Sequence, residues 1–228
     1  MNTVIFDPEF IEELYKEKDH VPAVMEDHRI NGINKLPPRP YTFPFTSSHL
    51  AIANFPEKAT NYLSLNGLWQ FHCALNPALR PKTFFENDYD VSDWSVIKVP
   101  GNWEAQGFDH AIYIDEHFPF NTECPQVPRD YNTVGSYRRT FEVDDNWEGR
   151  EIFLHLAGAR TASFIWINGE RVGYSQNAKS PAEFNITPYI QIGDNTISVQ
   201  IYRWSNASYV EKQDMLDMSG FEIGRAHV

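Results

Sequence analysis

Two alternating segments joined by an Asn-Gly pair occupy residues 163–174, and they limit the possible folds more than any other feature of the chain. The first segment reads Ser-Phe-Ile-Trp-Ile and the second reads Glu-Arg-Val-Gly-Tyr. Asn168 and Gly169 both tolerate positive φ angles, which the type I′ turn of a β-hairpin requires. The sequence therefore predicts a tight antiparallel hairpin at this position.

Alternation of apolar and polar residues recurs from about residue 62 onward. In the last such segment, Ile197, Val199 and Ile201 share one face, which is typical of a half-buried strand. Short strands with turn residues between them, and without amphipathic helices, indicate an all-β fold, an antiparallel jelly-roll β-sandwich. Besides the hairpin, strands are expected at 65–72, 94–99, 136–143, 152–156 and 195–202.

The N-terminal residues predict an arm in front of this sandwich. Asp7 is a suitable N-cap and Pro8 a suitable first residue for a helix that runs to about Tyr15. Residues 16–30 are polar and mixed in character, as expected for a linker, and the prolines of 33–40 favour an extended segment. The organisation expected is a helical and extended arm at 1–45 and a sandwich domain at 46–221.

Composition excludes several classes of partner. The net charge of −12 argues against nucleic acid and against an anionic membrane surface, because both require a cationic patch. The sequence shows neither a signal peptide nor an apolar run long enough to span a membrane, so we expect a cytoplasmic protein. Cys73 and Cys124 lack the spacing of a metal or redox site, and we expect both to be buried, reduced thiols.

A polar loop follows the last predicted strand, at residues 203–220. Amides and carboxylates beside Trp204 and Tyr209 are groups that bind sugar hydroxyls or a hard cation, with an aromatic face for the apolar side of a sugar. The alternative is an ordinary solvated loop whose polar residues face water. No catalytic motif or metal-ligand spacing occurs anywhere in the sequence. The polar residues of this loop are Asn206, Ser208, Glu211, Asp214 and Asp217.

Five motifs resemble, in their order, the N-terminal sugar-binding jelly roll of the family-two glycoside hydrolases. Within that family the chain is most similar to the large bacterial β-galactosidases, which carry an Ile-Asn-x-Leu-Pro-Pro-Arg segment like that at 33–39 and a loop like that at 208–215. The resemblance implies a galactose-binding-domain-like sandwich. The motifs lie at 66–71 (Asn-Gly-Leu-Trp-Gln-Phe), 99–113 (Val-Pro-Gly-Asn-Trp followed by Gly-Phe-Asp-His-Ala-Ile-Tyr), 135–141 (Gly-Ser-Tyr-Arg-Arg-Thr-Phe), 168–174 (Asn-Gly-Glu-Arg-Val-Gly-Tyr) and 203–205 (Arg-Trp-Ser).

The resemblance implies a retaining glycosidase that cleaves terminal β-galactosides such as lactose. Such an enzyme uses two glutamates about 5 Å apart, one as acid/base and one as nucleophile. In the family both lie on a TIM barrel several hundred residues further on, so no catalytic residue is expected in this chain, and the chain alone is expected to be inactive. The expected partners are the substrate, the barrel and other domains, and further copies in a homo-oligomer. For the intact enzyme the resemblance also implies sodium and magnesium.

The resemblance places substrate contacts at two positions. The family usually has an aspartate after Arg-Trp-Ser, which contacts sugar hydroxyls and sodium; here the residue is Asn206, which keeps a carbonyl oxygen but lacks the charge, so we expect weakened sodium binding. The second position falls on Glu123 in an ungapped match and on Asn121 after a small shift. Both alternatives remain open at this point.

The last seven residues depart from the family. Residues 222–228 read Glu-Ile-Gly-Arg-Ala-His-Val, which is the translation of a common sequencing-adapter read. We therefore expect this segment to be a non-native tail that contributes nothing to the fold. The expected function is that of a β-galactosidase fragment, and the alternative is a free-standing, non-catalytic carbohydrate-binding module.

Overall fold

The computed structural model describes residues 7–40, 43, 45–53, 55–59, 61–113, 118, 120, 123–177, 180–211, 216–217, 220–222 and 225–227. In these residues antiparallel strands dominate and the helices are short, which confirms the all-β class with an N-terminal helical arm. The α-helices described are α1 (Pro8–Tyr15), α2 (Ser48–Ala53) and α3 (Ser208–Glu211). Single 3-10 turns are η1 (Ala23–Glu26), η2 (Pro56–Lys58), η3 (Pro77–Leu79), η4 (Glu104–Gln106), η5 (Asp145–Trp147) and η6 (Thr187–Tyr189).

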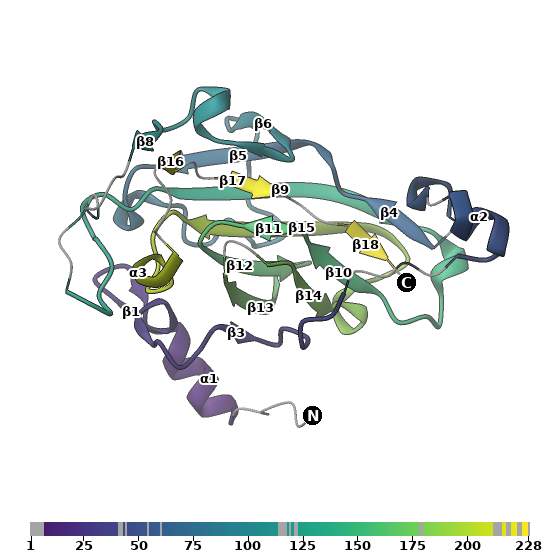
Figure 1. Ribbon diagram of the computed structural model, residues 1–228, viewed down its shortest axis with the longest axis horizontal. Coiled ribbons are helices and arrows are strands. Elements are labelled where there is room, and N and C mark those ends of the chain that lie inside the picture. Colours follow the sequence, from purple (N-terminus) through teal and green to yellow (C-terminus); the bar gives the residue numbers. More distant parts are fainter. Residues whose placement is uncertain are drawn as a thin grey trace.

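A seven-stranded antiparallel sheet is the largest layer (Figure 1). The longest strands, β9 and β15, pair over ten residues at its centre. In spatial order the strands are β3 (Gly32–Ile33), β13 (Glu170–Gln176), β12 (Ala162–Ile167), β15 (Gly193–Tyr202), β9 (Val134–Val143), β5 (Gly67–Ala74) and β6 (Ser95–Val99).

The predicted hairpin is confirmed as β12 and β13. Asn168 has φ +50° and Gly169 has φ +85°, the left-handed angles of the expected turn. The Asn168 side chain also joins the turn to its neighbours, since it accepts from the backbone N–H of Thr196 at 2.9 Å and donates to the backbone carbonyl of Tyr189 at 2.9 Å. This turn is therefore fixed both by backbone geometry and by side-chain hydrogen bonds.

Shorter sheets form the opposite layer and the rim. β18 pairs with both β10 and β4 and lies between them (Figure 1), so the segment expected to lie outside the fold takes a strand position. Pairing uses backbone groups alone, so an extended segment of almost any sequence can fill a gap between two strand edges. These sheets are β14 (Ala182–Asn185), β10 (Phe153–Leu156), β18 (Arg225–His227) and β4 (Tyr62–Ser64); β11 (Gly158–Ala159), β17 (Gly220–Glu222) and β7 (Gly101–Asn102); and β16 (Leu216–Asp217) with β8 (Ile112–Tyr113).

Hydrophobic clusters cover both faces of the large sheet. In β12, Ile165 and Ile167 join the cluster between the two layers, whereas Phe164 and Trp166 join a second cluster on the outer face. The expectation of a half-buried strand at 195–202 is wrong for the same reason. Gln200, on the outer face of β15, is 5% exposed and bonds to Arg80 and Pro81 in the segment after η3.

The arm supplies much of this outer cover. The expectation of a linker at 16–30 is wrong, since this segment forms the hairpin of β1 (Glu17–Lys18) and β2 (Val21–Pro22) and continues into η1. Val21, Val24 and Met25 are fully buried in the outer cluster. The α1 helix begins as predicted, with the Asp7 side chain accepting from the Glu9 backbone N–H. In Figure 1 the arm lies along one side of the sandwich and α2 lies at the far end.

Both cysteines are free thiols, but their burial differs from the expectation. Cys73 is partly buried, and this burial raises the pKa of its thiol to about 12. Cys124 is exposed, so the expectation of a buried thiol is wrong there. Cys124 belongs to an irregular loop, where no sheet face covers its side chain.

Candidate functional site

The strand β15 ends at the segment that carries Asn206. The Asn206 side chain is 6% exposed, its backbone N–H donates to the Met25 carbonyl at 3.0 Å, and its Oδ1 accepts from Gln176 Nε2. The Nδ2 of Asn206, by contrast, has no hydrogen-bond partner within the part of the chain that the structure describes. The predicted contact residue is thus largely enclosed, with an unused donor rather than an unused acceptor.

Ser208, the other polar residue of this loop whose side chain the structure describes, does not join Asn206 at an open site. The Ser208 hydroxyl is buried and accepts from the backbone N–H of Ser205 at 3.1 Å, so it closes a turn at the start of α3. Asp214 and the side chains of Glu211 and Asp217 lie outside the described residues. The expected polar cluster therefore remains a prediction for those three acids.

A buried ionic cluster lies just before Asn206. Arg203 is 1% exposed, and its Nη1 lies 2.7 Å from Asp109 Oδ2 and 2.8 Å from the Tyr131 hydroxyl. Burial tends to raise the pKa of Asp109, but hydrogen bonds and the charge of Arg203 outweigh burial and lower this pKa below its ordinary value. The cluster holds the loop around Tyr131 against the end of β15.

Further hydrogen bonds join the same two segments. Asn132 Oδ1 accepts from the Trp204 backbone N–H at 2.8 Å, and Asn132 Nδ2 donates to the Trp204 carbonyl at 3.1 Å. The Tyr209 hydroxyl donates to the Gln126 carbonyl at 2.5 Å. The loop at 126–133 and the segment at 203–209 therefore form one connected unit.

Aromatic rings lie beside this unit. Phe120 contacts Trp204 with ring centroids 5.4 Å apart and Tyr209 at 5.8 Å, and Phe118 contacts Tyr209 at 5.4 Å. Aromatic faces bury the apolar side of a sugar ring while polar groups at their edges bind its hydroxyls. Aromatic and polar groups therefore lie side by side here, but Phe118 and Phe120 come from a different loop than the one at 203–220.

A pocket of about 710 Å³ opens beside these rings, a volume in the range of small-molecule sites. The exposed Glu123 lines this pocket, whereas Asn206 does not, so the two predicted contact residues are not brought to one surface. Asn121 lies outside the described residues. The lining residues are Lys18, Asp19, Phe118, Phe120, Glu123, Gln126, Val127, Pro128, Arg129, Asp130 and Tyr131.

The predicted sodium contact at Asn206 stays a prediction. Its carbonyl oxygen accepts one hydrogen bond, from Gln176, and an amide oxygen has a second lone pair, whereas its Nδ2 is a donor that cannot coordinate a cation. Among the described residues, no three His, Cys, Asp or Glu side chains gather as metal ligands. The described helices also include none that is long and apolar enough to cross a membrane.

A profile of the family described as "Glycosyl hydrolases family 2, sugar binding domain" matches residues 62–225. The chain belongs to glycosyl hydrolase family 2. The match covers the large sheet except β3, the loop at 126–133 and the segment of Asn206, which confirms the resemblance inferred from the five motifs. Residues 1–61, which include the arm, α2 and η2, and the final three residues lie outside it.

Relatives within family 2 are β-galactosidases. The β-galactosidase of Priestia megaterium is 38% identical over 210 residues, which are 90% of this chain and 20% of that protein. The β-galactosidase of Clostridium acetobutylicum is 40% identical over 161 residues, or 69% of this chain and 18% of that protein. The β-galactosidase large subunit of Leuconostoc lactis is 34% identical over 212 residues, or 86% of this chain and 33% of the subunit. The chain thus spans about a fifth to a third of these relatives.

Solved structures of family 2 enzymes share the fold. A Bacteroides uniformis β-glucuronidase structure superimposes with a TM-score of 0.54 at 22% sequence identity, covering 73% of this chain and 18% of that one. A second structure of β-glucuronidase 2 from the same organism gives a TM-score of 0.53 at 20% identity, covering 72% of this chain and 17% of that one. Together with the strand pairing, this confirms the jelly-roll sandwich.

Sequence reasoning missed the pocket-lining Tyr131 and two carboxylates, Glu26 and Asp109, that hold the neighbouring loops in place. Glu26, Asp109 and Tyr131 are far apart in the chain, and no spacing rule relates them. One signal was available in the arm, because an Asp-His pair between Lys18 and Val21 has the length of a two-residue hairpin turn, and aspartate tolerates the left-handed conformation. Asp19 and His20 adopt φ angles of +52° and +68° there.

Proposed function

We propose that this chain supplies the sugar-binding part of a β-galactosidase that hydrolyses terminal β-galactosides by the retaining mechanism. The observation that carries the proposal is the match to the Priestia megaterium β-galactosidase, which extends over 90% of this chain at 38% identity. The aromatic and polar lining of the 710 Å³ pocket supports a sugar as the ligand.

The two catalytic glutamates of the proposed mechanism belong to a further domain, so this chain contributes binding and no proton transfer. Asn206 and either Glu123 or Asn121 remain the predicted substrate contacts. Sodium and magnesium, the further domains and the homo-oligomer remain predictions for the whole enzyme, as does its cytoplasmic location. No step of the proposal depends on a metal.

The direct test uses the purified 228-residue chain. We expect no release of nitrophenol from nitrophenyl β-galactoside, and we expect lactose binding with a dissociation constant of about 1 mM or weaker, because this chain forms only part of a concave pocket. Turnover by the pure chain would contradict the placement of the catalytic groups elsewhere. Micromolar binding without turnover would favour the alternative of a free-standing carbohydrate-binding module.

A further inference from the structure

The N-terminal arm forms part of the pocket, although the family 2 match begins only at residue 62. Lys18 and Asp19, at the turn of the β1–β2 hairpin, line the pocket together with Glu123 and Tyr131. An ammonium group and a carboxylate bring a donor and an acceptor to this wall, which are the groups that bind sugar hydroxyls. The pocket therefore has a wall that the matched domain does not supply.

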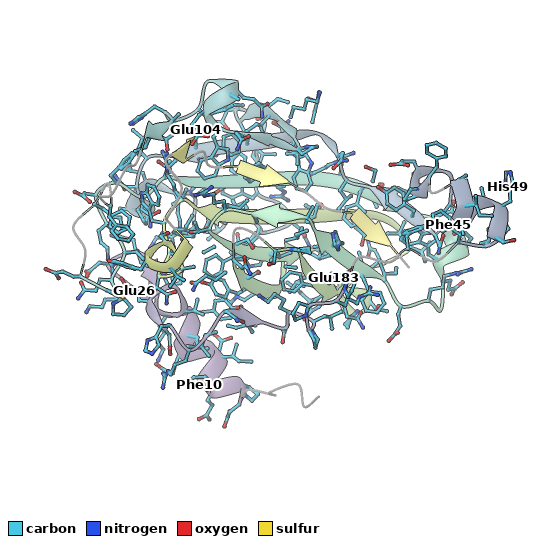
Figure 2. All side chains as sticks on the ribbon, in the orientation of Figure 1. Phe10, Glu26, Phe45, His49, Glu104 and Glu183 are labelled. Atoms are coloured by element: carbon cyan, nitrogen blue, oxygen red, sulfur yellow. The ribbon has the colours of Figure 1, made fainter. Side chains whose placement is uncertain are left out.

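Glu26 connects the arm to the pocket loop. Its Oε1 accepts from the Val127 backbone N–H at 2.8 Å and from Arg129 Nη1, and its Oε2 accepts from Arg129 Nη2 at 2.9 Å. A bidentate guanidinium–carboxylate pair fixes the relative orientation of the two groups as well as the distance between them. Since Val127 and Arg129 both line the pocket, Glu26 sets the position of this loop. Figure 2 shows Glu26 at the end of the sandwich where α3 lies.

Met25, which precedes Glu26, connects the arm to the segment that carries Asn206. The Met25 carbonyl accepts from the Asn206 backbone N–H at 3.0 Å, and the Met25 side chain is fully buried. Glu17, at the start of the hairpin, adds a contact at the other side, where Lys82 Nζ lies 3.0 Å from its Oε2 and Arg80 also pairs with it. The arm is thus anchored by packing and ion pairs while it touches both loops of the site.

We propose that the arm forms part of the sugar pocket and contributes to sugar binding. In this proposal Glu26 is a positioning residue, and Lys18 and Asp19 are contacts that determine specificity for the glycan. This inference rests on the proposed function, because it assumes that the pocket binds a β-galactoside. It assigns to residues 18–26 a role in affinity that a surface-covering linker would not have.

The first test compares Glu26→Ala with Glu13→Ala, a change at an exposed residue of α1 in the same arm. In the Glu26→Ala chain we expect amide exchange of Val127 to be at least about tenfold faster, because its N–H loses its acceptor. We also expect the lactose dissociation constant to rise about three- to tenfold. Glu13→Ala should leave both values unchanged. Unchanged Val127 exchange in Glu26→Ala would overturn the inference.

A second variant keeps the test decisive if Glu26→Ala folds poorly. Lys18→Ala changes an exposed side chain at the hairpin turn. It should leave the melting temperature unchanged and weaken lactose binding about threefold, a result that a purely structural arm would not give. Wild-type lactose affinity in Lys18→Ala would overturn its role as a contact. If the wild-type chain binds no galactoside, the proposed function fails, while Val127 exchange still decides whether Glu26 holds the loop.

Discussion

Glu26 and Asp109 are carboxylates whose ionised forms are stabilised by their partners. Burial tends to raise the pKa of Glu26, but hydrogen bonds from Arg129 and from the Val127 amide, with the charge of Arg129, outweigh burial and bring this pKa below its ordinary value of 4.5. A carboxyl group whose pKa is lower in the folded state stabilises the fold above its unfolded pKa. This stabilisation is lost as the pH falls through the folded pKa.

Acidification should therefore weaken the chain through these carboxylates. We expect the free energy of unfolding to fall as the pH decreases below about 4.5, with a shallower fall in Glu26→Gln, which no longer has the titrating group. Urea denaturation across this pH range measures the difference. Arg129→Gln should also reduce the slope, because it removes the main partner of Glu26. A wild-type slope in both variants would contradict the assignment.

Gly135 permits close packing near the start of β9. A Cβ at this position would lie 2.5 Å from Trp103 Cζ2 and 2.8 Å from Phe71 Cε2, and both rings are fully buried. Gly135→Ala should destabilise the chain by about 1–3 kcal/mol through overpacking. Thr140→Ala on the same strand, at an exposed position, should change stability by less than about 1 kcal/mol. Equal denaturation midpoints for the two variants would contradict this packing argument.

Among the elements, the β12–β13 turn allows the cost of backbone strain to be distinguished from the cost of lost hydrogen bonds, by two substitutions of Asn168. Asn168→Gly tolerates the φ of +50° but loses the bonds to Thr196 and Tyr189, whereas Asn168→Ala also introduces strain. We expect Asn168→Ala to destabilise the chain by about 2–4 kcal/mol and Asn168→Gly by about 1 kcal/mol less. Thermal or chemical denaturation of both variants tests this order, and a more stable Asn168→Ala would contradict it.

The arm should behave as core rather than as a linker. Met25 is fully buried among aromatic and aliphatic side chains of the outer cluster. We expect Met25→Ala to destabilise the chain by about 2–5 kcal/mol, because it leaves a cavity. Leu75→Ala removes a side chain that is 55% exposed and should have an effect of less than about 1 kcal/mol. Comparable effects of the two changes on the urea midpoint would show that the arm is only loosely attached.

The sequence predicted those elements whose signal is local. Alternation and the Asn-Gly pair identified the hairpin and the central strands, because both follow from backbone geometry over a few residues. Burial of the outer face of β15 was not predictable in this way, since it depends on Val21, Val24 and Met25 packing there from a distant segment. The segment of Asn206 was found from its motif. The sequence did not identify the nearby residues Glu26, Asp109 and Tyr131, because only the folded chain brings them together.

In the whole molecule, the arm at Lys18 and Asp19 and the described loop residues from Phe118 to Tyr131 line the pocket, and the segment at 203–209 contacts that loop without lining the pocket. A second groove of about 320 Å³ is lined by Tyr62, Leu63 and Trp147 among others. Neither Asn206 nor Glu123 lines this groove, so it serves as an internal control for any binding experiment.

We expect a β-galactoside to bind in the 710 Å³ pocket. The most direct measurement is a titration of the ¹⁵N-labelled 228-residue chain with methyl β-galactoside, followed by amide chemical shifts. We predict shift changes confined to residues 18–26, 118, 120, 123–131 and 204–210, with smaller changes for methyl β-glucoside. Changes centred on the groove at Tyr62 and Trp147, or no changes at all at tens of millimolar sugar, would contradict the account.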